Sequence, residues 1–379
     1  MSITVASTPA ADGFRMPGEF CPHAGCWMAW PERGDVWRLQ GGPAQEAFAA
    51  VAEAIAAREP VTVGVSDHLF ERCRAALSPS VRVVELSTDD AWMRDAGPTF
   101  VIDDHGRRRG VHWHFNAWGG LHGGLYQPWD RDERVAAKVL EVEGADRYRA
   151  PLVLEGGSIH CDGEGTVLTT EECLLNPNRN PDLSREDVER LLLDYLGAER
   201  VVWLGRGLPH DDTDGHVDNV ACFVAPGRVL LSWADDPRDP MSEVSRDARQ
   251  RLLAATDARG RPLEVVRIPS PGPLQLEEAE AMTLQRRPGT RPHEVGERLP
   301  ASYVNFYPAN GRVVFPLLDE RYDEQAAQVL RDCFPEREVV GVPSREILLG
   351  GGNIHCITQQ VPRAAEPCAG VSAASPGSA

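Results

Sequence analysis

The sequence predicts an α/β protein in which about five ββαβ-like units follow one another and close into a ring. The order hairpin, helix, strand recurs along the chain, and a lone strand stands at each end. A Gly-Gly-x-Ile-His-Cys segment also occurs twice, at Gly156–Cys161 and Gly351–Cys356. Repeated segments usually indicate repeated architecture. If the two lone strands pair, they complete the last unit and close the ring.

The first part of the chain, residues 25–86, is expected to alternate between strands and helices. Pro43 falls in the first turn of a helix, and Ala44, Phe48, Val51 and Ile55 share its apolar face. The expected elements are strand Gly25–Trp30, helix Pro43–Arg58, strand Val61–Val65, a helix capped by Ser66 and ending at Leu77, and strand Val81–Leu86.

Four hairpins are expected further along, each followed by a helix and a strand. Asn310-Gly311 is a strong hairpin turn, and Ser184 with Asp187 is close to a capping box. The hairpins are Thr99–Ile102 with Val111–Phe115, Ser158–Cys161 with Thr166–Thr170, Val217–Val224 with Val229–Trp233, and Tyr303–Tyr307 with Val313–Leu317. The helices are Arg131–Glu143, Ser184–Leu196, Ser242–Ala255 and Glu320–Cys333, and the strands are Pro151–Leu154, Val201–Leu204, Leu263–Ile268 and Glu338–Val342.

The last expected strand, Asn353–Gln360, is the one that pairs with Gly25–Trp30. We therefore expect one catalytic domain over residues 1–363 and a disordered C-terminal tail over residues 364–379, which are small and Pro-rich. Residues 269–300 are rich in Pro, Glu and Arg and are expected to cross one face as a lid.

Composition and charge exclude several classes of protein. The chain has 379 residues, of which 42% are hydrophobic and 25% are charged, as in an ordinary globular protein. The net charge of −18 argues against nucleic acid as a partner and would attract a cationic small molecule. No run approaches the roughly 20 apolar residues of a membrane span.

Cysteine usage and the N-terminus favour a reducing cytoplasm. Nine cysteines, an odd number without paired spacing, argue against a disulfide framework and against a zinc site. Residues Met1–Gly13 have neither a basic region nor an apolar run, so we expect no signal peptide.

Cys356 is the candidate nucleophile. Three glycines run into this segment, and glycines allow a sharp bend and the close approach of another group. Taken alone, the segment equally fits a small buried structural cysteine. Cys161 has no catalytic partner of its own in the sequence, and we interpret it as structural. His160 and His355 alternate with their cysteines, so they are expected to point to the other face and serve packing.

The remaining polar motifs fall at one structural place, between the last strand of a unit and the next hairpin. Equivalent positions in a ring converge on its axis, which brings Asp95, Glu155, His216, Asp218 and Cys356 around one cavity. Near Cys356, His216 would activate the thiol or act as an acid and base, with Glu155 holding its ring. Two further carboxylates, Asp95 and Asp218, would repel each other unless a cation lies between them, and a planar guanidinium fits best. On a strand, His216 and Asp218 would face the same side.

Two rival interpretations come from other classes. The run His210–Asp218 has enough oxygen and nitrogen ligands for a divalent cation, which would make the protein a metal hydrolase, although it matches no known metal motif and leaves Cys356 unused. A ring-shaped binding module is the non-catalytic rival. Within the run, Asp211 and Asp212 are expected to be solvated turn residues.

At these motifs the chain resembles the agmatine deiminases of the guanidine-modifying, or pentein, superfamily. The resemblance extends from Met16 to Pro362. One departure is Glu19-Phe20-Cys21, where Glu-Trp-Glu would be usual; this difference is expected to touch the substrate rim. The motifs are Met16–Phe20, Trp27–Pro31, Trp92–Thr99, Glu155–Gly157, Asn176–Pro181, Thr213–Asp218 and Gly350–Gln360.

The resemblance implies a five-bladed β/α-propeller (pentein fold) with pseudo-fivefold symmetry around a central cavity. It implies a deiminase that converts agmatine to N-carbamoylputrescine and ammonia in putrescine biosynthesis, without cofactor or metal, and a homo-oligomer as the expected assembly. Arginine and peptidyl-arginine are the alternative substrates. The implied catalytic residues are Cys356 as nucleophile, His216 as acid and base and Glu155 as its partner; the implied substrate-binding residues are Asp95 and Asp218, with Trp92, Gly351 and Gly352 from the same motifs.

Overall fold

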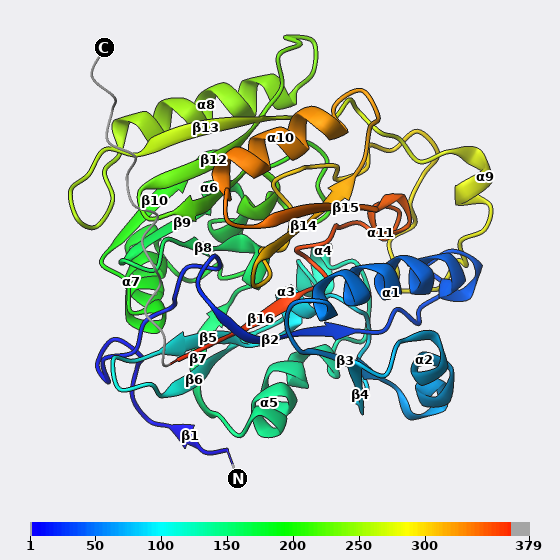
Figure 1. Ribbon diagram of the computed structural model, residues 1–379, viewed down its shortest axis with the longest axis horizontal. Coiled ribbons are helices and arrows are strands. Elements are labelled where there is room, and N and C mark those ends of the chain that lie inside the picture. Colours follow the sequence, from blue (N-terminus) through cyan, green and yellow to red (C-terminus); the bar gives the residue numbers. More distant parts are fainter. Residues whose placement is uncertain (1, 365–379) are drawn as a thin grey trace.

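The strands of the described chain form five separate sheets. The structure is a computed structural model and describes residues 2–364. Helices and strands alternate along the chain, and Figure 1 shows the long helices toward the periphery with the strands between them. The predicted α/β class is therefore confirmed, whereas none of the described sheets closes on itself.

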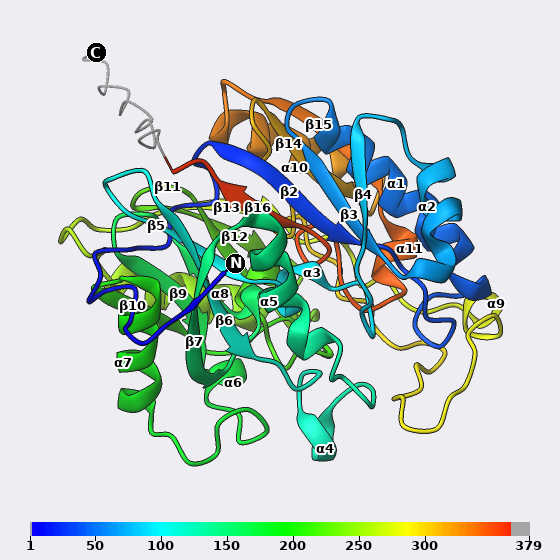
Figure 2. The ribbon, with the colours of Figure 1, turned by 90° about the horizontal axis from the view of Figure 1, so that it is seen from below.

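The predicted pairing of the two ends of the chain is confirmed. Strand β16 (Gln359–Pro362) runs antiparallel to β2 (His23–Ala29), and β2 is followed by α1 (Gly42–Ala56) and by the parallel strand β3 (Val61–Val65). Figure 1 shows β16 and β2 side by side although they come from opposite ends. This sheet continues to β4 (Val81–Glu85), and α1 and α2 (Phe70–Ala76) lie on the same side of it (Figure 2).

Three further sheets contain the predicted order of hairpin, helix and parallel strand. In each, the first two strands pair antiparallel and the strand after the helix pairs parallel with the second. The short N-terminal strand β1 (Thr4–Val5) extends the first of these sheets by pairing with β7. The elements are β5 (Thr99–Ile102), β6 (Arg108–His114), α5 (Asp132–Glu143) and β7 (Asp146–Val153); β8 (His160–Cys161), β9 (Thr166–Thr170), α7 (Arg185–Leu196) and β10 (Arg200–Leu204); and β11 (Ala221–Ala225), β12 (Arg228–Trp233), α8 (Met241–Ala254) and β13 (Glu264–Pro269).

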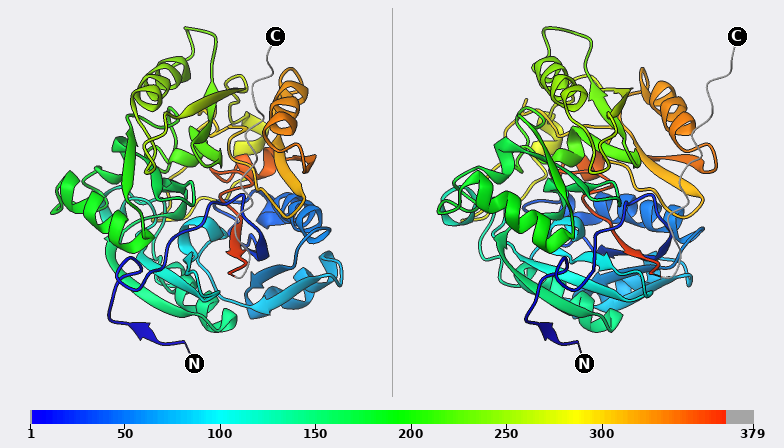
Figure 3. Two further views of the ribbon diagram at one scale, coloured as in Figure 1. Left: turned by 60° about the vertical axis from the view of Figure 1, so that its left-hand side comes forward. Right: turned by 90° about the vertical axis from the view of Figure 1, so that its left-hand side faces the viewer.

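The fourth predicted hairpin is only partly present. Strands β14 (Arg312–Leu317) and β15 (Glu338–Pro343) pair parallel around α10 (Asp323–Cys333), but Tyr303–Tyr307 forms no strand and touches β14 through one bridge, Tyr307 to Val314. The side chain of Asn305 instead bonds elsewhere, as described below. Figure 3 shows this unit next to the N-terminal unit, where α1 packs against β14 and β15.

The segments that lead into the hairpins are short helical turns, and Ser158, Val217–Asn219 and Asn353–Thr358 are corrections because they were expected to be strand residues. The turns are α3 (Met93–Ala96), a 3-10 turn at Gly156–Ser158, a 3-10 turn at Val217–Asn219, and turns over residues 354–357. Residues 353–358 are thus not part of the last strand, and His216 and Asp218 do not lie on one. Each turn directs side chains inward where an extended strand would alternate them between two faces.

Local signals explain several of the helix boundaries. The capping box of α7 is present, since Ser184 accepts from the backbone of Asp187 and the Asp187 side chain accepts in return. The predicted cap at Ser66 is wrong, because its side chain makes no capping bond and a 3-10 turn at Asp67–Leu69 precedes α2. The short helices α4 (Gly120–Gly123), α6 (Glu171–Leu174), α9 (Glu278–Ala281) and α11 (Arg345–Leu348) were not expected.

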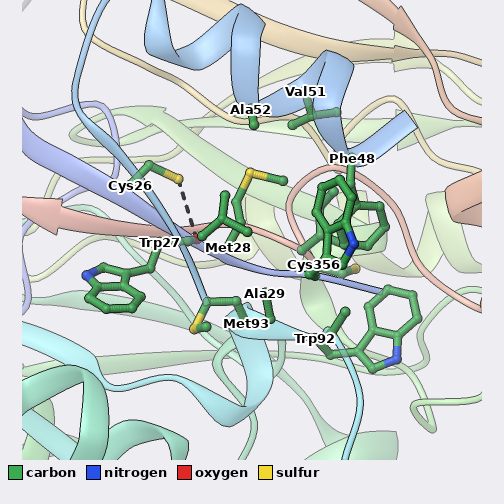
Figure 4. Close-up of a cluster of buried hydrophobic side chains, with 14 of the residues drawn as sticks. Cys26, Trp27, Met28, Ala29, Phe48, Val51, Ala52, Trp92, Met93 and Cys356 are labelled. Carbon is green, nitrogen blue, oxygen red and sulfur yellow. Dashed lines mark hydrogen bonds between the residues drawn. The ribbon is translucent and has the colours of Figure 1, made fainter. Parts of the chain in front are cut away.

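Apolar side chains fill the spaces between each sheet and its helices. The largest cluster joins the sheet of β2 to α1 and reaches Trp92 and Cys356, which Figure 4 shows together with Phe48 among its members. The wall on this side of Cys356 is therefore apolar and tightly packed.

Candidate active site

Gly157 lies at the point where the predicted site residues converge. A Cβ atom placed on this glycine would lie 2.6 Å from His216 Nδ1, 2.9 Å from Asp218 Oδ2 and 3.0 Å from Asp95 Oδ1. His216 and Asp218 come from the 3-10 turn at Val217–Asn219 and its cap, whereas Asp95 comes from α3. The structure thus brings together residues that are separated by more than a hundred positions in sequence.

Cys356 lies beside this point. Its Sγ is 3.7 Å from Asp218 Oδ2, and Asn305 Nδ2–H donates to it at 3.3 Å. Asn305 Oδ1 accepts from the backbone N–H groups of His355 and Cys356 at 2.9 and 3.3 Å, which fixes the turn that carries the thiol. Burial, followed by the carboxylates of Asp218 and Asp95, raises the pKa of the Cys356 thiol well above its usual range. This environment favours the neutral thiol over the thiolate.

His216 is fully buried between two carboxylates. Its Nε2 is 3.4 Å from Glu155 Oε2, and its Nδ1 is 3.9 Å from Asp95 Oδ2. Burial favours the neutral ring, but Asp95, Cys173 and Glu155 outweigh it and hold the pKa of His216 well above its usual range. The ring is thus an imidazolium, and within the described residues its Nδ1 has no hydrogen-bond partner.

Arg179 fixes the Glu155 carboxylate. Its Nε–H donates to Glu155 Oε1 at 3.0 Å, and its other nitrogens donate to the backbone oxygens of Trp118 and Thr213. Although burial alone would raise it, the guanidinium of Arg179 and the ring of His216 lower the pKa of Glu155 to about 2. Arg179 was not predicted as a site residue, and the only sequence signal for it was its place in the Asn176–Pro181 motif.

Asp95 and Asp218 are held by different sets of hydrogen bonds. Asp95 accepts from Gly157 N–H and from Trp118 Nε1–H, both at 2.9 Å. Trp118 has φ of +60°, an uncommon backbone conformation that is found most often at functional sites. Asp218 accepts from His355 Nδ1–H through Oδ2 at 2.8 Å, while its Oδ1 has no partner in the described chain.

His355 does not serve packing alone, which corrects the sequence-based expectation. Its other ring nitrogen, Nε2, faces Glu19 Oε2 at 2.9 Å, and both residues are buried. The prediction was wrong because it assumed a strand, on which alternate side chains face opposite ways; in the observed turn, His355 and Cys356 both reach Asp218. His160 and Cys161 have no contact with Asp95, His216 or Asp218 within hydrogen-bonding distance, in line with the structural role expected for Cys161.

The glycines before Cys356 make room for tryptophan rings. A Cβ on Gly352 would lie 2.4 Å from the ring of Trp92 and 3.1 Å from Cys356 Cβ. Trp92 is buried, and its Nε1–H donates to Asp90. Gly351 has φ of +103°, which favours glycine, and a Cβ there would meet Asp212 Oδ2 at 3.5 Å. Gly352 therefore lies between the Trp92 ring and Cys356, whereas Gly351 lies beside Asp212.

The acidic residues before His216 are not solvated, contrary to expectation. The Asp212 side chain is only 8% exposed and forms an ion pair with Arg291, which belongs to the 269–300 segment. Asp211 accepts from the backbone N–H and the hydroxyl of Thr213, and burial raises its pKa to about 6. The turn is packed because Asp211 bonds back to the chain while the 269–300 segment covers Asp212.

The run 210–218 does not assemble a metal site in the described part of the chain. Two groups of three potential ligands lie close together there: Glu19, His160 and His355, and Glu155, Cys173 and His216. Only His216 comes from the run, and each group lies beside a buried arginine, Arg94 or Arg179, whose charge opposes a cation. The predicted metal interpretation therefore gains no support from the geometry.

Comparison with known proteins shows which family the chain belongs to. The family described as Porphyromonas-type peptidyl-arginine deiminase matches residues 15–362 of the chain. The chain belongs to this family. Its relatives include an agmatine deiminase of Pseudomonas fluorescens, 57% identical over 361 residues, covering 95% of this chain and 98% of that protein. An agmatine deiminase of Pseudomonas aeruginosa is 57% identical over 358 residues, covering 94% of this chain and 97% of the relative.

Among solved structures of the family, the agmatine deiminase of Enterococcus faecalis is 50% identical to this chain and superposes with a TM-score of 0.93. The match covers 96% of this chain and all of that one. The resemblance noted in the motifs is thus confirmed over almost the whole sequence.

Two further expectations can be compared with the structure. Among residues 2–364, no helix is both long enough and apolar enough to span a membrane. Within residues 2–364, seven cysteines are free and buried, including Cys173 and Cys356, whereas Cys21 is disulfide-bonded. The argument against disulfides therefore does not hold for Cys21.

Proposed function

We propose that this protein is an agmatine deiminase that hydrolyses agmatine to N-carbamoylputrescine and ammonia through a covalent intermediate on Cys356. The observation that carries the proposal is the convergence of Asp95, Asp218 and His216 around Gly157, beside the Cys356 thiol. The agmatine deiminases among its relatives support the substrate.

The two aspartates bind the guanidinium group of the substrate. Asp218 Oδ1 is buried and has no hydrogen-bond partner among residues 2–364. Burial raises the pKa of Asp95, the Asp218 and Glu155 charges add to the effect, and His216 opposes it. A planar cation between the carboxylates removes this repulsion and can form paired hydrogen bonds with each. The bound positive charge also favours ionisation of Cys356, so the thiol loses its proton as the substrate binds.

The first half of the reaction forms the intermediate. Cys356 Sγ attacks the guanidinium carbon and forms a C–S bond, and the tetrahedral adduct expels one nitrogen as ammonia after it takes a proton from the His216 imidazolium. The remaining group is an S-alkylthiouronium on Cys356. Covalent capture divides one difficult hydrolysis into two easier steps.

The second half consumes water. His216, now neutral, removes a proton from a water molecule that attacks the same carbon and becomes an imidazolium again. As the C–S bond breaks, the remaining hydroxyl proton of the adduct passes to the sulfur, so the neutral ureido product and the Cys356 thiol are released. Glu155 holds the ring and balances the charge that His216 gains, because Arg179 keeps the carboxylate ionised. Trp92, Gly351 and Gly352 border the reacting carbon.

The acidic turn favours a substrate with a cationic tail. Asp212 Oδ1 pairs with Arg291, whereas Oδ2 faces Gly351 in the segment that leads to Cys356, and the side chain is nearly buried. An ammonium at the far end of agmatine suits Oδ2, whereas the carboxylate of free arginine would be repelled. Peptidyl-arginine is the second candidate because the family carries that name.

We also propose an architecture and a biological setting for the enzyme. We infer that the five sheets are the blades of a β/α-propeller around the site and that residues 1–363 form one catalytic domain. The predicted tail lies outside the described residues except for residue 364. Cytoplasmic putrescine biosynthesis from arginine is the proposed setting, and a homo-oligomer is the proposed assembly.

Product analysis tests the function. Agmatine, arginine and a peptidyl-arginine are supplied separately, with and without EDTA, and the ureido product and ammonia are measured. We expect turnover of agmatine alone, no effect of EDTA, loss of turnover in Cys356→Ser, and near loss in His216→Ala with accumulation of the adduct by mass. Cys161→Ser, in the matching motif, should retain turnover. An active Cys356→Ser enzyme would refute the mechanism, and loss of activity with EDTA would favour a metal hydrolase.

A further inference from the structure

His355 is placed between two carboxylates and donates to both. Its Nδ1 faces Asp218 Oδ2 at 2.8 Å, and its Nε2 faces Glu19 Oε2 at 2.9 Å and Oε1 at 3.1 Å. All three side chains are at most 3% exposed. A neutral imidazole has only one N–H, so only the doubly protonated ring satisfies both acceptors.

The groups that face His355 hold it in that state. Glu19 is fixed by Arg94 Nη1–H at 3.1 Å, and Arg94 Nε–H donates to the backbone oxygen of His355 at 3.3 Å. Burial and Arg94 favour the neutral ring, but Glu19 and Asp218 outweigh them and raise the pKa of His355. The remaining titratable neighbours are His160, which lies 3.7 Å from Glu19, and Cys356 itself.

The contact with His355 decides which Asp218 oxygen is free. Oδ2 is taken by His355 and also lies 3.7 Å from Cys356 Sγ, whereas Oδ1 has no partner in the described chain. A single atom, Asp218 Oδ2, therefore lies between the His355 imidazolium and the Cys356 thiol. A positive charge this near the sulfur stabilises the thiolate.

We propose that Glu19 and His355 form a positioning pair for the reaction: Glu19 holds His355 as an imidazolium, and His355 orients Asp218 and eases ionisation of Cys356. Neither residue touches the substrate, so both act through Asp218 and the thiol. The inference rests on the proposed function, in which Asp218 binds the guanidinium and Cys356 attacks it.

His160 provides an internal contrast from the other copy of the motif. It also neighbours Glu19, but its Nδ1 accepts from the backbone N–H of Phe223 at 3.2 Å, so that nitrogen carries no proton. Burial lowers the pKa of His160 to about 4. Two histidines at matching positions thus have different charges, and only His355 contacts Asp218.

The test compares His355→Gln, Glu19→Gln and the matched control His160→Gln. Without substrate, the rate at which iodoacetamide alkylates Cys356 is measured between pH 7 and pH 10, with the site of modification confirmed by peptide mass. Below the thiol pKa the rate follows the thiolate fraction. We expect a fall of about tenfold in His355→Gln, a fall in the same direction in Glu19→Gln, and no change in His160→Gln. With agmatine, KM should rise about tenfold in His355→Gln because Asp218 is no longer held.

Two outcomes would overturn the pairing: wild-type alkylation in both folded variants, or an equal fall in His160→Gln, which would indicate a general effect of altering the core. If His355→Gln does not fold, Glu19→Gln decides the question. Alkylation needs no substrate, so the two proposals can fail separately. If the wild type turns over agmatine but Cys356 is alkylated at the wild-type rate in His355→Gln and Glu19→Gln, the pair is rejected and the proposed function stands.

Discussion

Replacing Gly157 with alanine should disable the enzyme while leaving it folded. The backbone of this glycine does not require the left-handed conformation, so alanine is compatible with its backbone angles. There is no space for the added methyl group, which would lie 2.6, 2.9 and 3.0 Å from the polar atoms of His216, Asp218 and Asp95.

The size of the effect follows from these distances. An ordinary contact begins near 3.4 Å, so His216 Nδ1 must move by about 0.8 Å and the two carboxylate oxygens by about half that. A misplacement of about 1 Å in a catalytic constellation can cost about 100-fold in rate. We therefore expect kcat/KM for agmatine to fall about 100-fold. Overpacking should lower the free energy of unfolding by about 1–3 kcal/mol.

The assay pairs steady-state turnover of agmatine with urea unfolding, so that lost activity is separated from lost protein. Gly42→Ala is the matched control, because it adds a methyl group at a helical position with no atom within 4 Å. That variant should keep full activity, because Gly42 is remote from the three side chains around Gly157. Activity of Gly157→Ala within threefold of the wild type would refute the arrangement of the three side chains described above.

Two further predictions concern carboxylates around the site. In Asp212→Asn, KM for agmatine should rise about 10–100-fold with kcat nearly unchanged, since a hydrogen bond to a charged group contributes about 1.5–3 kcal/mol; unchanged KM would remove Asp212 from substrate recognition. For Glu155, the folded pKa of about 2 lies below the unfolded value of about 4.5, so its contribution to stability, about 3 kcal/mol, is complete above pH 5 and is lost as the pH falls toward 2. The difference in unfolding free energy between wild type and Glu155→Gln should shrink over that range, and a constant difference would contradict the assigned cause.

Local patterns in the sequence were sufficient for most of the fold. Strands such as Val61–Val65 and Thr166–Thr170 have the predicted bounds. A run of β-branched residues between turn residues predicts both the strand and where it ends. The pairing of β16 with β2 could also be predicted, since each would otherwise be a lone strand. The errors lie at Tyr303–Tyr307, Val217–Asn219 and Asn353–Thr358, where apolar residues suggest strands but the backbone turns.

Those errors changed the expected roles of particular residues. His355 was assigned to packing by strand alternation, yet the turn aims it at Asp218. Asp212 was expected in water, yet the 269–300 segment covers it. Four residues from distant parts of the chain contact the predicted site residues, and no local sequence pattern predicts such contacts. They are Arg179, Trp118, Asn305 and Glu19.

The sequence by itself determined the α/β class, the repeated units, the identity of the family and the set of residues that meet around Cys356. These depend on periodicity, turn residues and motifs, which are properties of short segments. Only the tertiary structure decided which atoms face one another: that Gly157 leaves space for three polar side chains, that Arg179 holds Glu155, and that Glu19 and His355 hold Asp218. Charge states in a buried site depend on neighbours within a few ångströms, and the fold alone chooses those neighbours.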